Sequence, residues 1–491
     1  MRTRKILITL CAVSLTWLAA AAAPTWQPQV EQLMRQGEFK QAARLMDRLP
    51  KAERKANAVV IDSLKTIMQR IERDFSMTPE EGERLIRERV PNVTPEQLAR
   101  WKAARQLEVM NIDGKERWFR KSIRNLWLLA PDFKQSQDAD RKASYEEKRQ
   151  QFVETMKAEA GSNHTHDWRQ ADITFTLDVE ADAVPAGETL RVWMPIPYSN
   201  ARQRNIEITW GNRAFHESEG SKHHTIYMEA VAEKGKPTHF EYRFNYELAE
   251  RHIAQQDILT LLEPYDTSSE EYKEYTGNQA PHIIITDEMR ALARRIVGNE
   301  TNPVLQAQLI FDWISKTFPW AGAREYSTLE NIPQYVLANN HGDCGQVTLL
   351  YITLVRSLGI PARWESGWWI KPGEENWHDW AETYFEGVGW VYTDQSNGRS
   401  TYGTPMSTYY LSGMDLYRMA SNEGTGDVLD PEKTFIRSET VDFQPGEVEW
   451  RGGNLFYDKW NSHLKVNSLI PVKEVKTQRI KPMGHSRKDA F

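Results

Sequence analysis

The stretch NNHGDCGQVTLLYITLVRSLGIPARWESGWW, residues 339–369, contains one of only two cysteines in a chain of 491 residues. The other, Cys11, lies in an apolar segment near the N-terminus. The run after Cys344 is apolar at helical spacing, and Gly359 followed by Pro361 ends such a helix. The residues of its expected apolar face are Val347, Leu350, Tyr351 and Leu354. The sequence therefore predicts that Cys344 begins a helix.

A thiol at the start of a helix has a predictable chemistry. The unpaired N–H groups of the first turn and the helix dipole favour negative charge, so we expect the pKa of Cys344 to lie below that of a free thiol. A cysteine left alone in an exported protein suggests a reactive thiol or an intermolecular disulfide. The alternative is an inert cysteine, because free cysteine is among the most buried residue types.

Residues 1–23 are typical of a secretory signal peptide. Arg2, Arg4 and Lys5 precede an apolar run that ends at Leu18, and a run of alanines follows. The apolar run is shorter than the roughly 20 residues that cross a bilayer. We therefore expect an exported protein, periplasmic or extracellular, with no membrane span after cleavage. The formal charge of −6 is mild for this length and argues against nucleic acid as a partner.

Hydrophobic periodicity divides the rest of the chain into four predicted domains and predicts a multidomain α+β fold. Residues 24–160 show apolar positions at helical spacing and predict a helical domain. Residues 165–252 alternate with period two and predict a β-sandwich. Residues 270–420 mix helices and strands and predict an α+β core. Residues 421–491 predict a β-rich extension that packs on the core or on the sandwich.

Two pairs of histidines occur in or next to the predicted sandwich. They are His164 and His166, and then His223 and His224. Neither pair is accompanied by the convergent cysteines or carboxylates that a metal site requires. We expect loop histidines here, and no metal or other cofactor.

The segment WHDWAETYFE, residues 377–386, reads as a strand with His378 on one face. A hairpin turn at Glu386 and Gly387 would bring Asp394, in the following strand, nearly opposite His378. A carboxylate in this place fixes the imidazole tautomer and stabilises the imidazolium. The spacing thus predicts a Cys–His–Asp triad of Cys344, His378 and Asp394. The alternatives are a core histidine at 378 and a turn-capping aspartate at 394.

The pattern GDC…LLYITLVRSLGIPAR…SGWW…HDWAETYFEGVGWVYTDQS closely resembles the catalytic core of the transglutaminase-like superfamily. The resemblance covers about residues 286–398. It implies a papain-like α+β fold, with Cys344, His378 and Asp394 in the nucleophile, base and orienting positions. Arg363 and Trp380 match framework positions. No part of the sequence matches the extra domains or the calcium-binding loops of animal transglutaminases.

The implied reaction is thiolate attack on a peptide or carboxamide carbonyl, followed by a thioester that water or an amine resolves. The oxyanion needs hydrogen-bond donors. The backbone N–H of Cys344 is one, and the side chain of Trp320 or Gln334 is a candidate for the second. The aromatic residues that could line a substrate groove, unless they pack in the core, are Trp368, Trp369 and Trp377.

The leading hypothesis is an exported cysteine amidohydrolase that acts on a peptide, protein or cell-wall amide. Protein-glutamine amine transfer differs only in the acceptor that resolves the thioester. A non-catalytic binding or scaffold protein on the same core is the third interpretation, and an intact triad argues against it.

Overall fold

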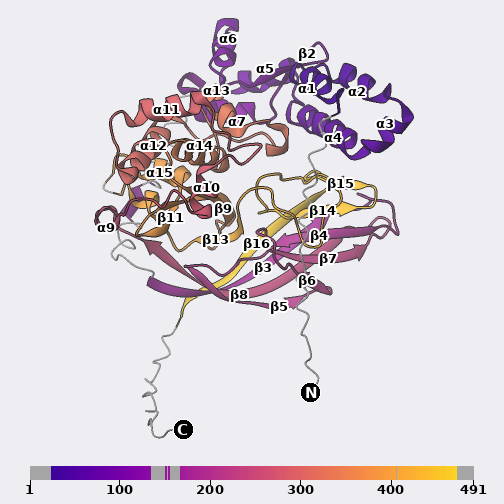
Figure 1. The fold of residues 1–491 in the computed structure, drawn as a ribbon. Coiled ribbons are helices and arrows are strands. Elements are labelled where there is room, and N and C mark those ends of the chain that lie inside the picture. The colour runs from indigo at the N-terminus through magenta and orange to yellow at the C-terminus, as the bar shows by residue number, and fades with distance from the viewer. Residues whose placement is uncertain are drawn as a thin grey trace, which may run out of the picture. The chain divides into compact units, whose positions relative to one another are not determined.

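The computed structural model describes residues 24–133, 147, 150, 151, 153, 154, 166–404 and 406–472 (Figure 1). The predicted signal peptide, His164 and the side chain of His166 lie outside the described residues. Helices and antiparallel sheets alternate along the chain, which confirms the predicted α+β class. The chain divides into two compact units, and the first comprises residues up to Glu83 together with Glu108–Arg120. Of the range 24–160 predicted as a helical domain, Arg84–Leu107 groups with the second unit.

The first unit has a helical core. Its helices are α1 (Gln27–Arg35), α2 (Phe39–Asp47), α3 (Lys51–Ala56) and α4 (Ala58–Asp74). Gly37 separates the first two with a φ of 75°, which glycine adopts without strain.

A β-hairpin in this unit was not expected, since the sequence prediction was helical throughout. Strands β1 (Val109–Ile112) and β2 (Lys115–Trp118) pair across a turn at Asp113 and Gly114. Both turn residues have positive φ, as a two-residue hairpin turn requires, and Asp-Gly is a strong sequence signal for it.

The second unit begins, after α5 (Pro79–Arg89), with the short helices α6 (Pro95–Ala103) and α7 (Ser122–Leu129). Asn125 of α7 donates from its amide to the Gly322 carbonyl at 3.0 Å and accepts from the Gly322 N–H at 2.9 Å. This reciprocal pair anchors the loop that carries Trp320.

Residues 166–252 form the expected strands. They are β3 (His166–Val179), β4 (Thr189–Pro195), β5 (Gln203–Gly211), β6 (Phe215–Glu217), β7 (Thr225–Val231) and β8 (Thr238–His252). One sheet has the order β12–β8–β3–β16, with β5 also paired to β8, and the other the order β15–β14–β4–β7–β6. Side chains from both sheets share one buried core, including Phe175, Met194, Met228 and Phe244.

The C-terminal segment completes this sandwich. Strand β14 (Glu447–Trp450) pairs with β4 and with β15 (Gly453–Leu455), and β16 (Trp460–Pro471) runs antiparallel along β3. Figure 1 shows β16 beside β3, although residues 180–459 of the chain lie between the two strands. Strand β12 (Gly413–Met414) extends the same sheet at β8.

The core that follows the sandwich is a layer of helices packed on an antiparallel sheet. Its strand order is β11–β10–β9–β13. The strands are β9 (Ala362–Trp369), β10 (Asn376–Phe385), β11 (Gly389–Thr393) and β13 (Arg418–Glu423). The helices are α9 (Gln255–Leu261), α10 (Glu270–Thr276), α11 (Asp287–Val297), α12 (Pro303–Thr317), α13 (Ile332–Asn339), α14 (Cys344–Ser357) and α15 (Gln395–Thr401).

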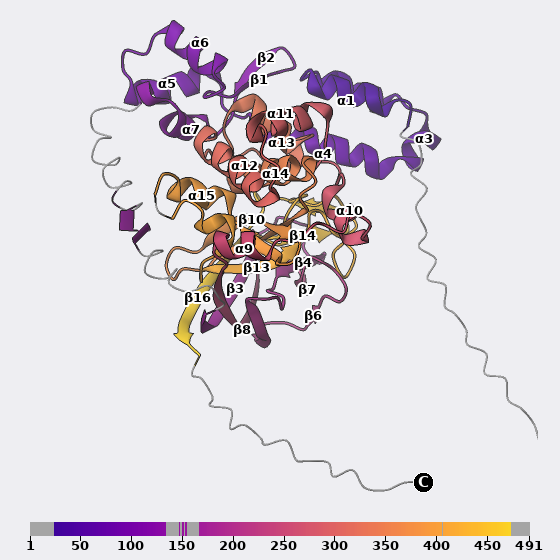
Figure 2. The same cartoon turned by 60° about the vertical axis from the view of Figure 1, so that its left-hand side comes forward.

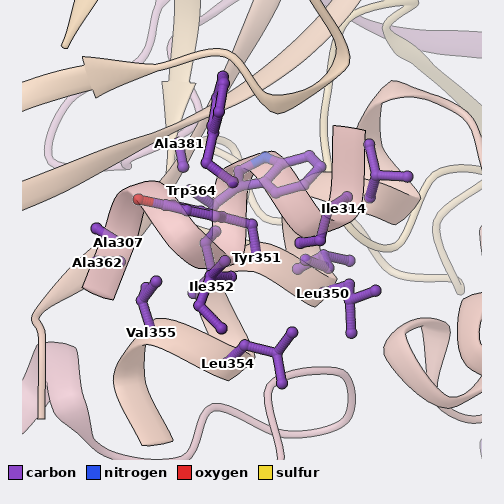
Figure 3. Close-up of a cluster of buried hydrophobic side chains, with 14 of the residues drawn as sticks. Ala307, Ile314, Leu350, Tyr351, Ile352, Leu354, Val355, Ala362, Trp364 and Ala381 are labelled. Atoms are coloured by element: carbon purple, nitrogen blue, oxygen red, sulfur yellow. The ribbon is translucent and has the colours of Figure 1, made fainter. Parts of the chain in front are cut away.

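Helix α14 is the centre of this core. It contacts α11, α12 and α13, among which it lies in Figure 2, and it also contacts strands β9 and β10. Leu350, Tyr351 and Leu354 are fully buried, and Figure 3 shows them packed with Trp364 of β9 and Ala381 of β10. The sequence predicted one apolar face, but side chains from Gly345 to Arg356 are buried on every side. Such a helix is rigid, and its first residue is held firmly in place.

Candidate active site

Cys344 is the first residue of α14, as the sequence predicts. The Asp343 side chain accepts from the backbone N–H of Gln346 at 3.1 Å, and the Asp343 N–H donates to the Gln346 side chain at 3.2 Å. This reciprocal capping box fixes the turn that presents the thiol. The Tyr326 hydroxyl donates to Asp343 at 2.6 Å and braces the cap from outside.

The thiol of Cys344, a half-buried residue, donates to a carboxyl group. Its Sγ lies 3.3 Å from Oδ2 of Asp379. Burial, followed by the negative charges of Asp379 and Asp343, raises the pKa of Cys344 well above its usual value. The expected lowering of this pKa is therefore wrong. The field of the helix N-terminus acts on the thiol, but desolvation and two carboxylates outweigh it.

His378 and Asp394 meet as predicted, with 2.7 Å between Nε2 and Oδ2. The centre of the hairpin turn lies one residue later than predicted, because Phe385 pairs with Gly389 and Ala381 with Thr393. This register centres the turn on Gly387 and places Asp394 after the end of β11, across from Trp380. The contact with His378 is therefore diagonal along one face of the sheet.

Asp394 is fully buried and surrounded by donors. Arg418 donates from Nη2 to Oδ2 at 3.0 Å, and the backbone N–H of Asn397 donates to Oδ1 at 3.0 Å. Burial alone would raise the pKa of Asp394, but the charges of His378 and Arg418 and these hydrogen bonds hold it below its ordinary value. The capping interpretation also holds, since Asp394 is the N-cap of α15. Both roles are compatible because each uses a different oxygen.

The thiol contacts the strand that carries the imidazole. Asp379, the partner of the thiol, directly follows His378 on β10. Among the described residues, the hydrogen-bond partner of the Cys344 side chain is Asp379 and not His378. The structure thus pairs His378 with Asp394 and turns the protonated thiol of Cys344 to Asp379, the neighbour of the histidine.

Gln444 in the C-terminal extension also reaches this strand. Its amide donates to the His378 carbonyl at 2.8 Å and to Oδ1 of Asp379. The backbone carbonyl of Gln444 accepts from the indole N–H of Trp368 at 2.8 Å. Sequence reasoning missed Gln444 and Arg418, because neither lies in a local pattern that points to the triad.

Burial, followed by the negative charge of Asp343, raises the pKa of Asp379 to about 8. Asp442 lies within hydrogen-bonding reach of Asp379, and its own pKa is raised by burial and by the charge of Asp379. The side of the site that holds the thiol is therefore acidic and poorly solvated.

The two oxyanion candidates differ in position. Trp320 is 39% exposed and forms a β-bridge with Gly342, two residues before Cys344, so its segment runs beside the start of α14. Gln334 is exposed in the first turn of α13, five residues before that helix ends at Asn339. At 1.5 Å per residue, the helix carries Gln334 away from the Cys344 turn.

The three groove candidates also separate. Trp368 is 3% exposed and packs in the sandwich core against Phe175, so it lines no groove. Trp369 is half-buried and stacks on Arg418. Trp377, next to His378, is 42% exposed and is the one of the three that a substrate could reach directly.

The framework residues form buried polar pairs. Arg363 donates to Glu382 at 2.5 Å, and the indole N–H of Trp380 donates to Glu365. These contacts tie β9 to β10 and hold the strand that carries His378.

No group of three or more metal-ligating side chains converges within the described residues. Of the helices that the structure describes, none has the length and apolar character of a membrane span. His223 lies in the loop between β6 and β7, as expected, and it is buried there and accepts from Arg437 at 3.1 Å.

Residues 290–395 match the model of the transglutaminase-like superfamily. This part of the chain is a transglutaminase-like domain. The match includes Cys344, His378 and Asp394 and ends before Arg418 and Gln444.

Comparisons that extend beyond this domain find proteins of low sequence identity. An uncharacterized protein of Haemophilus influenzae is 23% identical over 270 residues, which cover 48% of this chain and 71% of that protein. A candidate cysteine protease from Cytophaga hutchinsonii is similar in structure over 64% of this chain and 92% of its own, with 16% identity and a TM-score of 0.43. The periplasmic domain of TgpA from Pseudomonas aeruginosa matches 49% of this chain and 90% of its own, with 14% identity and a TM-score of 0.26. These values carry no information about the chemistry of this chain.

Proposed function

We propose that the chain is an exported cysteine amidohydrolase that cleaves a peptide or carboxamide bond through a thioester on Cys344. One observation carries the proposal: a buried, ionised Asp394 bonded to His378 on the strand whose next residue contacts the thiol. His378 acts as base and acid, and Asp394 holds its tautomer. The signal-peptide pattern at the N-terminus supports export.

The contact geometry assigns the two imidazole nitrogens. Nε2 of His378 faces Asp394, so its N–H donates there and Nδ1 is left as the base. Because the resting thiol of Cys344 is protonated, attack begins when the thiol turns from Asp379 and transfers its proton to Nδ1. Sulfur then bonds to the substrate carbonyl carbon, and Asp394 stabilises the imidazolium that forms.

The rest of the cycle returns every group to its starting state. The imidazolium of His378 gives its proton to the departing amine as the C–N bond breaks, which leaves an acyl thioester on Cys344. Water loses a proton to Nδ1 and attacks the thioester carbon. The carboxylic acid leaves, and the sulfur regains its proton.

The oxyanion that forms in each attack lies at the start of α14. The backbone N–H of Cys344 points out of the helix N-terminus, where the helix dipole favours negative charge. We assign the second donor to the indole N–H of Trp320, because its segment pairs beside Cys344. Gln334 is the weaker choice, since it is exposed in the first turn of α13. Trp377 is the proposed contact for a substrate chain.

The test uses isotopic water. The purified mature chain is incubated with a peptide and muropeptide library in H₂¹⁸O containing a labelled primary amine. Hydrolysis places one ¹⁸O in each new carboxyl group, whereas amine transfer forms a labelled amide. We expect ¹⁸O incorporation that Cys344→Ala abolishes.

Two results would contradict this proposal. Labelled amide in excess of labelled acid would show an amine transferase. Equal product from wild type and Cys344→Ala would show that Cys344 forms no thioester and that the cleavage does not depend on it.

A further inference from the structure

A single carboxylate oxygen contacts both the imidazole of His378 and the guanidinium of Arg418 in this site. Oδ2 of Asp394 accepts from Nε2 of His378 at 2.7 Å and from Nη2 of Arg418 at 3.0 Å. It also accepts from the side-chain amide of Asn397 at 3.0 Å. The side chains of both Asp394 and Arg418 are fully buried. Asp394 and Arg418 are therefore shielded from bulk solvent.

Arg418 is fixed from its other side. Its Nη1 donates to Oδ1 of Asp415 at 3.2 Å, and its guanidinium lies 3.9 Å above the ring of Trp369. Asp415 in turn accepts from the Tyr410 hydroxyl at 2.7 Å and from the backbone N–H of Tyr417 at 2.8 Å. The guanidinium is thus a planar bridge between two buried carboxylates, a geometry that lysine cannot reproduce.

The need for a second cation follows from the proposed cycle. His378 is neutral before attack and after each proton delivery, and a neutral imidazole does little to keep a buried carboxylate ionised. Arg418 stays charged at every pH at which the protein is folded. Its charge is therefore present in the part of the cycle in which the histidine supplies none.

We propose that Arg418 is a positioning residue that keeps Asp394 ionised and aimed at His378 while the imidazole is neutral. The proposal rests on the function proposed above and extends the triad to a residue beyond the matched range 290–395. Arg418 acts through Asp394 and does not touch the reacting atoms.

The charged and titratable groups around Asp394 come from several elements. They are His378 on β10, Arg418 on β13, Asp415 in the preceding turn and Tyr410 next to it. Asn397 of α15 contributes neutral donors. Arg418 is thus the permanent positive charge in direct contact with Asp394, and its removal should leave that carboxyl free to take up a proton at mildly acidic pH.

The experiment compares two buried arginines. Arg202 is also fully buried, and it donates to the backbone carbonyls of Arg418 and Asp415 at 2.8 and 2.7 Å without touching Asp394. The variants are Arg418→Gln, Arg418→Lys and the matched control Arg202→Gln. The pH profiles of kcat and KM are measured for each with a substrate found in the H₂¹⁸O experiment.

For Arg418→Gln we expect the acid limb of kcat to move up by about one to three pH units, the effect of one adjacent opposite charge on a carboxyl. We expect kcat to fall more than tenfold with KM within about threefold, since substrate binding is untouched. Arg418→Lys should restore the acid limb but only part of kcat. Arg202→Gln should lower Tm and leave the acid limb where it is. A wild-type acid limb in Arg418→Gln would overturn the proposal.

A second readout needs no turnover. The ¹⁵N shifts of the His378 ring report its tautomer, and we expect Nε2–H alone in wild type and a mixture in Arg418→Gln. An unchanged tautomer in that variant would overturn the positioning role. If no variant forms product but the tautomer still changes, the proposed function fails and the role of Arg418 stands. Should Arg418→Gln not fold, a wild-type kcat and tautomer in Arg418→Lys would refute the bridging role.

Discussion

Asp379 and Asp394 are buried aspartates on either side of His378, yet their pKa values move in opposite directions. Burial raises the pKa of Asp379 to about 8, because its charged neighbours are carboxylates such as Asp343. Burial also acts on Asp394, but His378 and Arg418 pull its pKa below the ordinary value. The two aspartates are equally buried but differ in charge. Asp379 keeps its proton, whereas Asp394 stays ionised.

This difference explains the resting state of the thiol. Cys344 lies on the acidic side, where a second negative charge is unfavourable. Its thiol therefore stays protonated and donates a hydrogen bond to Asp379. His378 is held on its other side by Asp394, which stays ionised. The arrangement favours general-base activation of a neutral thiol over a preformed thiolate–imidazolium pair.

The largest expected effect comes from removing the anion. Asp394→Asn should lower kcat by about 10³–10⁴-fold, because the imidazole loses both its tautomer control and its counter-charge. Steady-state kinetics on a substrate from the H₂¹⁸O experiment measures the effect. The control is Asp74→Asn, which removes an equally buried aspartate that is ion-paired to Arg120 at 3.0 Å. A kcat within threefold of wild type for Asp394→Asn would refute the role of this carboxylate.

The next effect is on the thiol itself. Asp379→Asn removes the negative charge that Asp379 carries above about pH 8, so the pKa of Cys344 should fall and alkylation by iodoacetamide at pH 9 should be roughly tenfold faster, the effect of one pKa unit. Intact-mass spectrometry follows the reaction, with Asp74→Asn as the control. An alkylation rate equal to that of wild type would show that Asp379 does not suppress the thiolate.

Stability should respond to pH with opposite sign at the two aspartates. Asp379 is protonated in the fold up to about pH 8 but ionised in the unfolded chain above about pH 4, so its burial costs stability increasingly as pH rises between these values. The folded-state pKa of Asp394 is depressed, so its contribution is present above about pH 4 and is lost as pH falls through that lower pKa.

Chemical denaturation at pH 5 and pH 8 separates the two cases. Asp379→Asn should gain about 3–4 kcal/mol relative to wild type between pH 5 and pH 8, since one proton is worth about 1.4 kcal/mol per pH unit. The loss of stability in Asp394→Asn should be equal at pH 5 and pH 8, since Asp394 is ionised at both. A pH-independent difference for Asp379→Asn would contradict the raised pKa.

The smallest effect is expected at Gln444. Gln444→Ala removes the amide that holds both the His378 carbonyl and the Asp379 carboxyl, and should cost about 1–3 kcal/mol of stability. We expect kcat to fall only a few-fold, because Asp394 still holds the imidazole. The stability comes from denaturant titration and kcat from the same substrate assay. A loss of kcat as large as that of Asp394→Asn would show that the extension shapes the chemistry directly.

The sequence was informative where the determinants are local. The start of α14 at Cys344, its end before Gly359 and the hairpin that joins His378 to Asp394 each follow from spacing and turn residues within a few positions. The β1–β2 hairpin could have been found in the same way, because Asp113 and Gly114 signal it.

The residues that could not be predicted act at long range. Arg418 and Gln444 reach the site from segments 24 and 66 residues away from their partners. The thiol pKa was predicted with the wrong sign, because the helix N-terminus is visible in the sequence whereas burial beside Asp379 and Asp343 is not. Charge balance in a buried site depends on tertiary contacts, which spacing along the chain does not encode.

The pH dependence of Cys344 alkylation in the unmodified protein tests the central claim most directly. The rate constant for iodoacetamide is measured from pH 5 to pH 10 by peptide mapping. We predict a rate that stays low at neutral pH and reaches half its maximum above the pH at which a free cysteine does, because the resting thiol is protonated. A fast rate that is already constant below pH 7 would show a preformed thiolate and contradict the account.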